Sequence, residues 1–224
     1  MYLSRLAATK EFAFMKALQA EGFPVPEPIS QSRHTVLMSL VDSFPLRQIA
    51  KVPSPEVLYA DLINMILRLA QHGLIHGDFN EFNILIREDK AEQDPSTVTL
   101  TPIIIDFPQM VSMDHRNAEM YFDRDVACIK RFFERRFHFV STTPGPFFKD
   151  AKKLVGRDGA TRLDATAEAS GFSKKMAKDL EAAIQEKVEA RGDQDEDGDD
   201  YEEDSEGREE DDDEGLQAHV IIGG

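Results

Sequence analysis

Hydrophobic residues recur at helical spacing in several long stretches of the chain. In the first, residues 3–20, leucine, alanine and phenylalanine alternate with lysine and glutamate before Gly22. The second runs from Ser54 to His72, with Ser54 placed as an N-cap, Pro55 in the first turn and Gly73 after the end. These signals are typical of helix starts and stops, so both stretches predict helices.

Two more helices are predicted in the second half of the chain. Asn117 is placed to cap one of them, and its expected core side chains are Met120, Val126, Ile129, Phe132, Phe133 and Phe137. The last helix is expected from about residue 173 to residue 190, with one apolar face made of Met176, Leu180, Ile184 and Val188.

Short apolar runs bounded by turn residues predict strands. After the proline-rich "FPVPEPI", the run "HTVLMSLV" (34–41) predicts a buried strand. Two further strands are expected, one from Ile84 to Ile86 and one in "PIIIDF" (102–107), joined by a polar loop from Arg87 to about Thr101. Such a pair would form a hairpin whose outer ends lie close together.

Charge is distributed unevenly along the 224 residues. The formal net charge is -16, and the acidic excess lies mostly beyond Ala190, where Gly192 to Gly215 are nearly all Asp, Glu and Gly. This run predicts a disordered tail that either aids solubility or docks a basic partner. The acidic excess argues against a nucleic-acid binder of the simple basic-patch kind.

Other features of the sequence exclude whole classes of protein. One cysteine, Cys128, allows neither a disulfide framework nor a cysteine zinc site within the chain. No apolar run approaches membrane-spanning length, and "MYLSRLAATKEF" lacks the apolar centre of a signal peptide. We therefore expect a soluble intracellular protein that has no membrane partner.

The stretch "GLIHGDFNEFNILI" (73–86) interrupts an apolar run with polar residues. Asp78 and Asn83 lie five apart in it, and Asp106 ends the later run of three isoleucines. The predicted hairpin would bring these carboxylate and amide oxygens together, and such hard oxygens suit Mg²⁺. The spacing H-x-D-x-x-x-x-N, followed by a strand-terminal Asp, is typical of phosphoryl transfer. Each residue taken alone could instead be an ordinary turn residue.

Several separated segments resemble one family. "HGDFNEFNILI" and "IIIDFPQMVS" resemble the RIO family of atypical protein kinases, and "YLSRLAATKEFAFMKAL", "FPVPEPI" and "NAEMYFDRDVACIKRFF" resemble its Rio-two branch. The resemblance covers residues 2 to about 190. It implies an α/β, protein-kinase-like (RIO) fold with a residual N-lobe (1–41) and a mostly helical C-lobe (42–191), before the acidic tail (192–224).

The resemblance also implies roles for particular residues, with ATP and Mg²⁺ as cofactors. Asp78 is similar to the catalytic aspartate, whereas Asn83 and Asp106 are similar to the metal ligands. Asp106 is also similar to the residue that accepts phosphate. Glu11 resembles the helix glutamate that pairs with the ATP-binding lysine. The segment "MSLV" resembles the adenine-binding hinge, which adds Met38, Leu40 and Val41 to the expected nucleotide site.

The chain departs from the family pattern at its front. The first glycine is Gly22, so there is no Gly-rich phosphate loop before the predicted Glu11 helix, and no winged helix. Lys10 and Lys16 lie on that helix and cannot replace the ATP lysine, which is carried by a strand. We therefore expect a truncated N-lobe and, because preorganised charges supply most of the rate in this chemistry, a very poor kinase.

The leading interpretation is a serine/threonine kinase or ATPase of RIO type. The resemblance implies a monomer that acts on the pre-40S ribosomal particle, with its rRNA and ribosomal proteins, in the cytoplasm, with shuttling through the nucleus as an option. A catalytically dead binding module and a small-molecule phosphotransferase stay open as alternatives. Asp123 and Asp125 could either brace the catalytic loop or be solvated helix charges.

Overall fold

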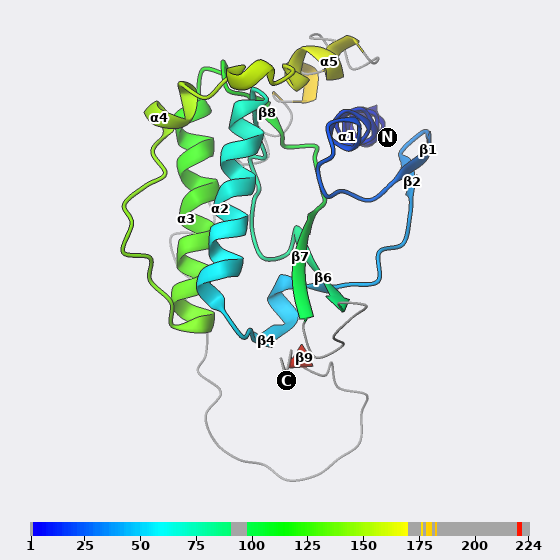
Figure 1. The fold of residues 1–224 in the computed structure, drawn as a ribbon. Coiled ribbons are helices and arrows are strands. Elements are labelled where there is room, and N and C mark those ends of the chain that lie inside the picture. Colours follow the sequence, from blue (N-terminus) through cyan, green and yellow to red (C-terminus); the bar gives the residue numbers. More distant parts are fainter. Residues whose placement is uncertain are drawn as a thin grey trace, which may run out of the picture.

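The computed structural model describes residues 2–90, 98–169, 176, 178–180, 182 and 219–220. Figure 1 shows a central hairpin with long helices on one side and the N-terminal helix on the other. Within the described residues, no helix has both the length and the apolar character needed to cross a lipid bilayer.

Helix α1 (Tyr2–Ala20) confirms the helix predicted over residues 3–20. Its inner face contains fully buried apolar side chains such as Met15 and Leu18. The same face also buries Lys10 and Glu11. Burial of ionisable groups on an apolar face is costly unless polar partners are supplied, so this part of α1 has to contact polar groups elsewhere in the fold.

A hairpin of β1 (Pro28–Ser32) and β2 (Thr35–Met38) follows α1. The strand predicted over 34–41 is therefore present but ends at Met38. The prediction that it is buried was wrong, since Thr35 and Leu37 are exposed and the other two residues are only partly buried. The proline-rich segment concealed β1, because proline usually argues against a strand. Pro28 is the first residue of β1, where a missing N–H group is tolerated.

Three helices pack together on one side of the fold, namely α2 (Pro55–Gln71), α3 (Ala118–Phe137) and the short α4 (Phe148–Lys152). Both long helices start and end close to the predicted positions. Ser54 and Asn117 occupy the N-cap positions, but neither side chain forms a capping hydrogen bond. Met120 was expected in the core and is instead 53% exposed, because it lies off the buried stripe of α3.

The central sheet has the order β3–β6–β7 and is antiparallel. It consists of β3 (Phe44–Pro45), β6 (Ile84–Lys90) and β7 (Val98–Ile104). The predicted hairpin is confirmed, but the polar loop from Arg87 to Thr101 was wrong in part. Both strands continue into it, as far as the pair Lys90 and Val98. This extension of the hairpin accepts polar residues because its described side chains are exposed or only partly buried.

Two small pairings complete the strands. β5 (Leu74–Ile75) pairs with β8 (Val111–Ser112), which joins the segment before Asp78 to the segment after Asp106. β4 (Ile49–Lys51) follows the 3₁₀ turn η1 (Leu46–Gln48) and pairs in parallel with β9 (His219–Val220). Except for β9, the predicted acidic tail lies outside the described residues. The boundaries at residues 41 and 191 stay predictions.

After α4 the chain passes through the turn η2 (Arg157–Gly159) into α5 (Leu163–Ala169), which packs against α1. Neither element was predicted, since both are too short to show a helical period. Of the helix predicted over 173–190, residues 176, 178–180 and 182 are helical. Leu180 is buried against α1, whereas Ile184 and Val188 lie outside the described residues.

Candidate active site

The loop between β5 and β6 carries Asp78 and Asn83. The Asn83 side-chain nitrogen Nδ2 donates to the Asp78 carboxylate at 2.9 Å and to the Asp78 carbonyl at 3.0 Å. A third bond comes from Asn80 Nδ2, which donates to the other Asp78 carboxylate oxygen at 2.8 Å. Both carboxylate oxygens of Asp78 are therefore held in fixed directions by amide donors.

Gly77 allows this loop to approach the segment that follows β7. Its φ is +79°, and a Cβ atom at this position would lie 2.6 Å from the carbonyl oxygen of Gln109. Glycine is thus required here by both the backbone conformation and the close contact.

Asp106 follows β7 and is joined to the same loop through its neighbour Ile105. The Ile105 amide donates to the Asn83 carbonyl at 3.1 Å, and His76 Nε2 donates to the Ile105 carbonyl at 3.1 Å. His76 is buried, and burial lowers its pKa to about 4, so the ring is neutral near pH 7. His76 thus ties the loop that carries Asp78 to the segment that carries Asp106. The predicted convergence of Asp78, Asn83 and Asp106 therefore exists.

The charges around Asp106 favour a cation. Partial burial and the negative charge of Asp78 both raise the pKa of Asp106. No hydrogen bond or ion pair to the Asp106 carboxylate is found among the described residues. Two nearby carboxylates without a cationic partner are typical of a position that a metal ion neutralises.

The residues present fit Mg²⁺ in one particular way. Because Asn83 Nδ2 is used by Asp78, the amide oxygen Oδ1 of Asn83, for which no bond from a described residue is found, is left as an acceptor. In the described part of the chain, no group of three or more His, Cys, Asp and Glu could hold a metal ion. An Asp and an Asn alone suit Mg²⁺, which keeps several waters and takes further oxygens from phosphates.

Glu11 reaches the metal-binding segment from α1. Its carboxylate accepts a 2.6 Å hydrogen bond from the amide of Phe107, the residue after Asp106. Burial raises the pKa of Glu11 to about 7, with a smaller contribution from the charge of Asp106. No ion pair to Glu11 is found among the described residues. The predicted glutamate is therefore in the site, although none of the described lysines forms an ion pair with it.

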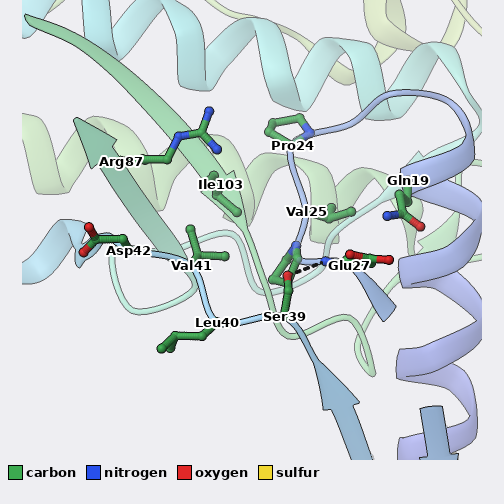
Figure 2. Close-up of a pocket in the computed structure, with 11 residues that line it drawn as sticks. Gln19, Pro24, Val25, Glu27, Ser39, Leu40, Val41, Asp42, Arg87 and Ile103 are labelled. Atoms are coloured by element: carbon green, nitrogen blue, oxygen red, sulfur yellow. Dashed lines mark hydrogen bonds between the residues drawn. The ribbon is translucent and has the colours of Figure 1, made fainter. Parts of the chain in front are cut away.

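The hinge residues lie at a separate cavity of about 400 Å³. Leu40 and Val41 line it, together with residues from the segment after α1 and from β6 and β7, as Figure 2 shows. The bond from the Glu27 amide to Ser39 Oγ, at 2.9 Å, fixes one wall. None of the residues that line this cavity is Glu11, Asp78, Asn83 or Asp106. Met38 instead packs against the core.

Asp125 on α3 is the residue that the sequence left undecided. Its two carboxylate oxygens accept the amides of Gly77 and Phe79, at 2.9 and 3.0 Å, on either side of Asp78. Burial raises the pKa of Asp125 to about 6. Asp123, by contrast, is exposed. A signal in the sequence could have separated them, because Asp125 falls on the buried stripe of α3 and Asp123 does not.

Together, the helix glutamate on α1 and the loop that carries Asp78 and Asn83, fastened to the segment of Asp106, define a fold of the protein-kinase-like class. The chain belongs to the RIO family, since the family model described as the RIO domain matches residues 1–144. The structure therefore has the predicted RIO kinase-like fold.

Relatives of known sequence agree with this assignment. The chain is 50% identical over 185 residues to the serine/threonine-protein kinase rio2 of Schizosaccharomyces pombe, covering 83% of this chain and 49% of that relative. It is 42% identical over 200 residues to RIO2 of Saccharomyces cerevisiae, covering 83% of this chain and 46% of that protein. The chain thus spans about half the length of these curated relatives.

Solved structures show the same fold. The crystal structure of the Rio2 kinase from Chaetomium thermophilum matches with a TM-score of 0.82 and 81% identity, covering 85% of this chain and 58% of that chain. The complex described as Rio2 kinase-ADP/Mg²⁺-phosphoaspartate, from the same organism, matches with a TM-score of 0.81 and 81% identity, covering 85% of this chain and 56% of that chain.

The raised pKa of Glu11 predicts a pH-dependent stability. Because this pKa is about 7 in the folded chain against an ordinary 4.5, the protonated carboxyl stabilises the fold fully below pH 4.5, and this stabilisation is lost as the pH rises through 7. Glu11→Gln keeps the acceptor for Phe107 and removes the charge. Its unfolding free energy, relative to wild type, should rise between pH 5 and pH 8 by about 2 kcal/mol. Urea unfolding of both proteins measures this, and an equal difference at both pH values would contradict it.

Asp125→Ala tests whether Asp125 holds the catalytic loop. Without the carboxylate, the amides of Gly77 and Phe79 lose their acceptors, and their hydrogen exchange should become about tenfold faster or more. Asp123→Ala is the matched control, because this exposed carboxylate lies two residues away on the same helix. Unchanged exchange of both amides in Asp125→Ala would show that another group orders the loop.

Proposed function

We propose that this chain binds Mg²⁺-ATP and supports phosphoryl transfer of the RIO serine/threonine-kinase type. The observation that carries the proposal is the pair of hydrogen bonds on Ile105, which bring Asp106 beside Asp78 and Asn83. The relative whose structure is described as an ADP/Mg²⁺-phosphoaspartate complex supports the same cofactors for this chain.

The site residues divide the chemistry between them. Asp106 and the free Oδ1 of Asn83 would hold Mg²⁺, which neutralises the charge of the phosphates when bound. Asp78, whose carboxylate is oriented by Asn80 and Asn83, would orient an acceptor hydroxyl and take its proton. Asp106 could itself accept the phosphoryl group. A carboxylate oxygen then bonds to the γ-phosphorus while the bond from that phosphorus to the departing ADP oxygen breaks.

The state of Glu11 supports slow turnover by this chain alone. In active protein kinases, a lysine paired with the helix glutamate holds the phosphates. Glu11 is buried with a pKa of about 7, a value that a nearby cation would lower. We therefore propose nucleotide binding with poor catalysis. The same observation favours the second candidate, a catalytically dead binding module.

The proposed partner is a pre-40S ribosomal particle, with its 18S rRNA, in the cytoplasm. This extension rests on the family resemblance, which implies that ATP hydrolysis switches association with the particle. Membership of the RIO family argues against the small-molecule phosphotransferase.

Magnesium-dependent nucleotide binding tests the proposal directly. In the purified 224-residue chain, Asp106→Asn should weaken binding of a fluorescent ADP in the presence of Mg²⁺ by at least tenfold, about 1.4 kcal/mol. Binding in EDTA should change little, because the lost interaction passes through the metal. Asp123→Asn controls for the loss of one exposed acidic charge. Equal Mg²⁺-dependent affinity in wild type and Asp106→Asn would contradict the assigned metal site.

A particle-association assay separates the two candidate functions. For an ATP-switched protein, co-sedimentation with pre-40S particles should change severalfold between ATP and ADP, and Asp78→Ala should remove that difference. Association that is indifferent both to nucleotide and to Asp78→Ala would identify the binding module. No association at all would contradict the proposed partner.

A further inference from the structure

The segment that leads into α5 is fastened to the end of α2. The Gly156 amide donates to the Gln71 carbonyl at 2.8 Å, and the Leu163 amide donates to the His72 carbonyl at 3.0 Å. The ring nitrogen Nδ1 of His72 donates to the Thr161 carbonyl at 3.0 Å. The end of α2 leads directly into β5 and the loop that carries Asp78, so this attachment fastens the start of α5 to the chain just before that loop.

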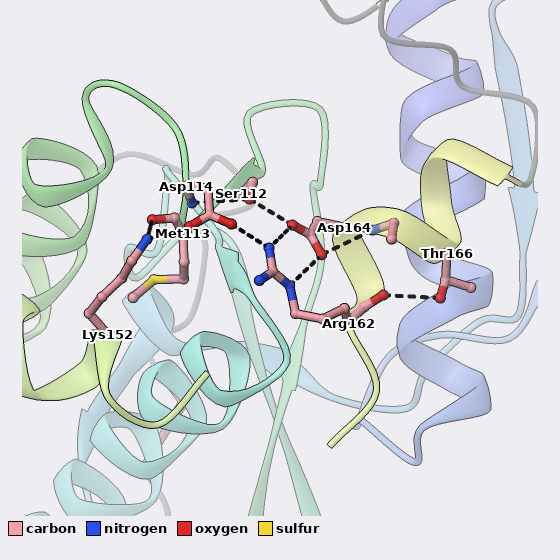
Figure 3. Close-up of polar contacts among 8 residues, drawn as sticks. Ser112, Met113, Asp114, Lys152, Arg162, Asp164 and Thr166 are labelled. Carbon is pink, nitrogen blue, oxygen red and sulfur yellow. Dashed lines mark hydrogen bonds and ion pairs between the residues drawn. The ribbon is translucent and has the colours of Figure 1, made fainter. Parts of the chain in front are cut away.

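Arg162 lies at the centre of the polar network in Figure 3. Its Nε donates to Asp164 at 2.9 Å, and its Nη2 donates to Asp114 at 2.7 Å. Lys152 also pairs with Asp114, at 2.5 Å, and the Ser112 hydroxyl donates to Asp164 at 2.7 Å. One guanidinium thus joins the start of α5 to the segment that leaves β8.

The fold makes room for this arginine. A Cβ atom on Gly73 would lie 2.6 Å from Arg162 Nε, and the φ of Gly73 is +81°. The backbone of Gly73 also accepts the Met113 amide at 2.9 Å. Arg162 therefore contacts the turn into β5 directly, four residues before Gly77.

From Arg162 the contact continues to α1. Helix α5 packs against α1, and Leu180 extends this packing onto Leu6 and Ala13. The Tyr2 hydroxyl donates to Asp179 at 3.1 Å. Helix α1 in turn carries Glu11, which accepts the Phe107 amide. The contacts form a closed circuit. The segment after Asp106 binds Arg162, which leads into α5, and α5 packs against α1. Glu11 on α1 then binds Phe107, which belongs to the segment after Asp106.

We propose that Arg162 is a positioning residue, which couples the segment after Asp106 to helix α1 and so fixes the Glu11–Phe107 contact beside the metal site. The functional part of this proposal rests on the proposed magnesium-nucleotide site. Arginine suits the position because its planar guanidinium bonds two carboxylates in fixed directions, which a lysine does not.

The solvent exposure of the Arg162 ion pairs determines whether loss of Arg162 should have a local or a global effect on stability. The Arg162 and Asp114 side chains are 39% and 58% exposed, and ion pairs this exposed contribute little to global stability. Loss of Arg162 should therefore loosen the local circuit and leave the core folded. A purely structural residue would instead lower the protection of the whole domain.

Hydrogen exchange on the full 224-residue chain separates these outcomes. In Arg162→Ala, the amides of Met113 and Phe107 should exchange about tenfold faster, while core amides of α2 and α3 stay within about twofold of wild type. Arg162→Lys should not restore protection. Arg157→Ala is the matched control, because Arg157 is an exposed arginine of the same segment whose side chain forms no ion pair with a described residue.

Either of two exchange results would overturn the proposal. One is unchanged exchange at both Met113 and Phe107 in Arg162→Ala. The other is an equal increase across α2 and α3, which would make the role of Arg162 merely structural.

A binding measurement tests the consequence for the site. Arg162→Ala should weaken Mg²⁺-dependent binding of fluorescent ADP severalfold, and Asp114→Asn should add nothing further in the double variant, because both act through one contact. Faster exchange with unchanged Mg²⁺-dependent affinity would overturn the positioning role. If wild type itself binds no Mg²⁺-nucleotide, the proposed function fails, and the exchange experiment alone decides whether Arg162 couples the two segments.

Discussion

The geometry of the site depends on the two backbone hydrogen bonds of one residue, Ile105. Its N–H donates to Asn83 and its carbonyl accepts from His76, so the residue before Asp106 is bonded on both sides to the loop that carries Asp78. The side chains that could bind metal lie more than twenty residues apart in the sequence. Backbone hydrogen bonds bring them together, because a buried strand end must satisfy its polar groups.

Gathering several carboxylates in this site has an electrostatic cost. Burial raises the pKa of Glu11, Asp106 and Asp125, and like charges contribute at each of them. Asp125 offsets its own burial by accepting two backbone amides. Glu11 accepts the Phe107 amide, whereas the exposed Asp106 carboxylate accepts no bond from a described residue and so keeps an unmet need for a cation. A magnesium ion carrying phosphates would meet that need, which links the electrostatics to the proposed function.

Most of the fold and of the candidate site could be predicted because they depend on local patterns. The periods of α1, α2 and α3, and the spacing from Asp78 to Asn83, are visible in the sequence. The short elements β1, α4 and α5 were missed, since a few residues show no period and tertiary contacts decide their conformation. Asp125 was undecided because its partners, Gly77 and Phe79, are more than forty residues away, although its position on the buried stripe of α3 was a usable signal. No pattern in the sequence indicates the role of Arg162, because the carboxylates that it binds, Asp114 and Asp164, lie in separate segments.

The turn after Asp106 shows how the chain compensates for a backbone conformation that is costly in itself. Asp106 has φ +69°, a left-handed conformation that costs a residue other than glycine roughly 1–2 kcal/mol. On one side Ile105 is fixed by the catalytic loop. On the other side the Phe107 amide donates to Glu11. The Phe107 carbonyl accepts the Met110 amide, which closes a turn that has Pro108 in its second position. Proline restricts that turn further. The backbone of Asp106 is thus held by its neighbours on both sides, which fixes the position from which its carboxylate extends toward the site, as a metal ligand or a phosphoryl acceptor requires.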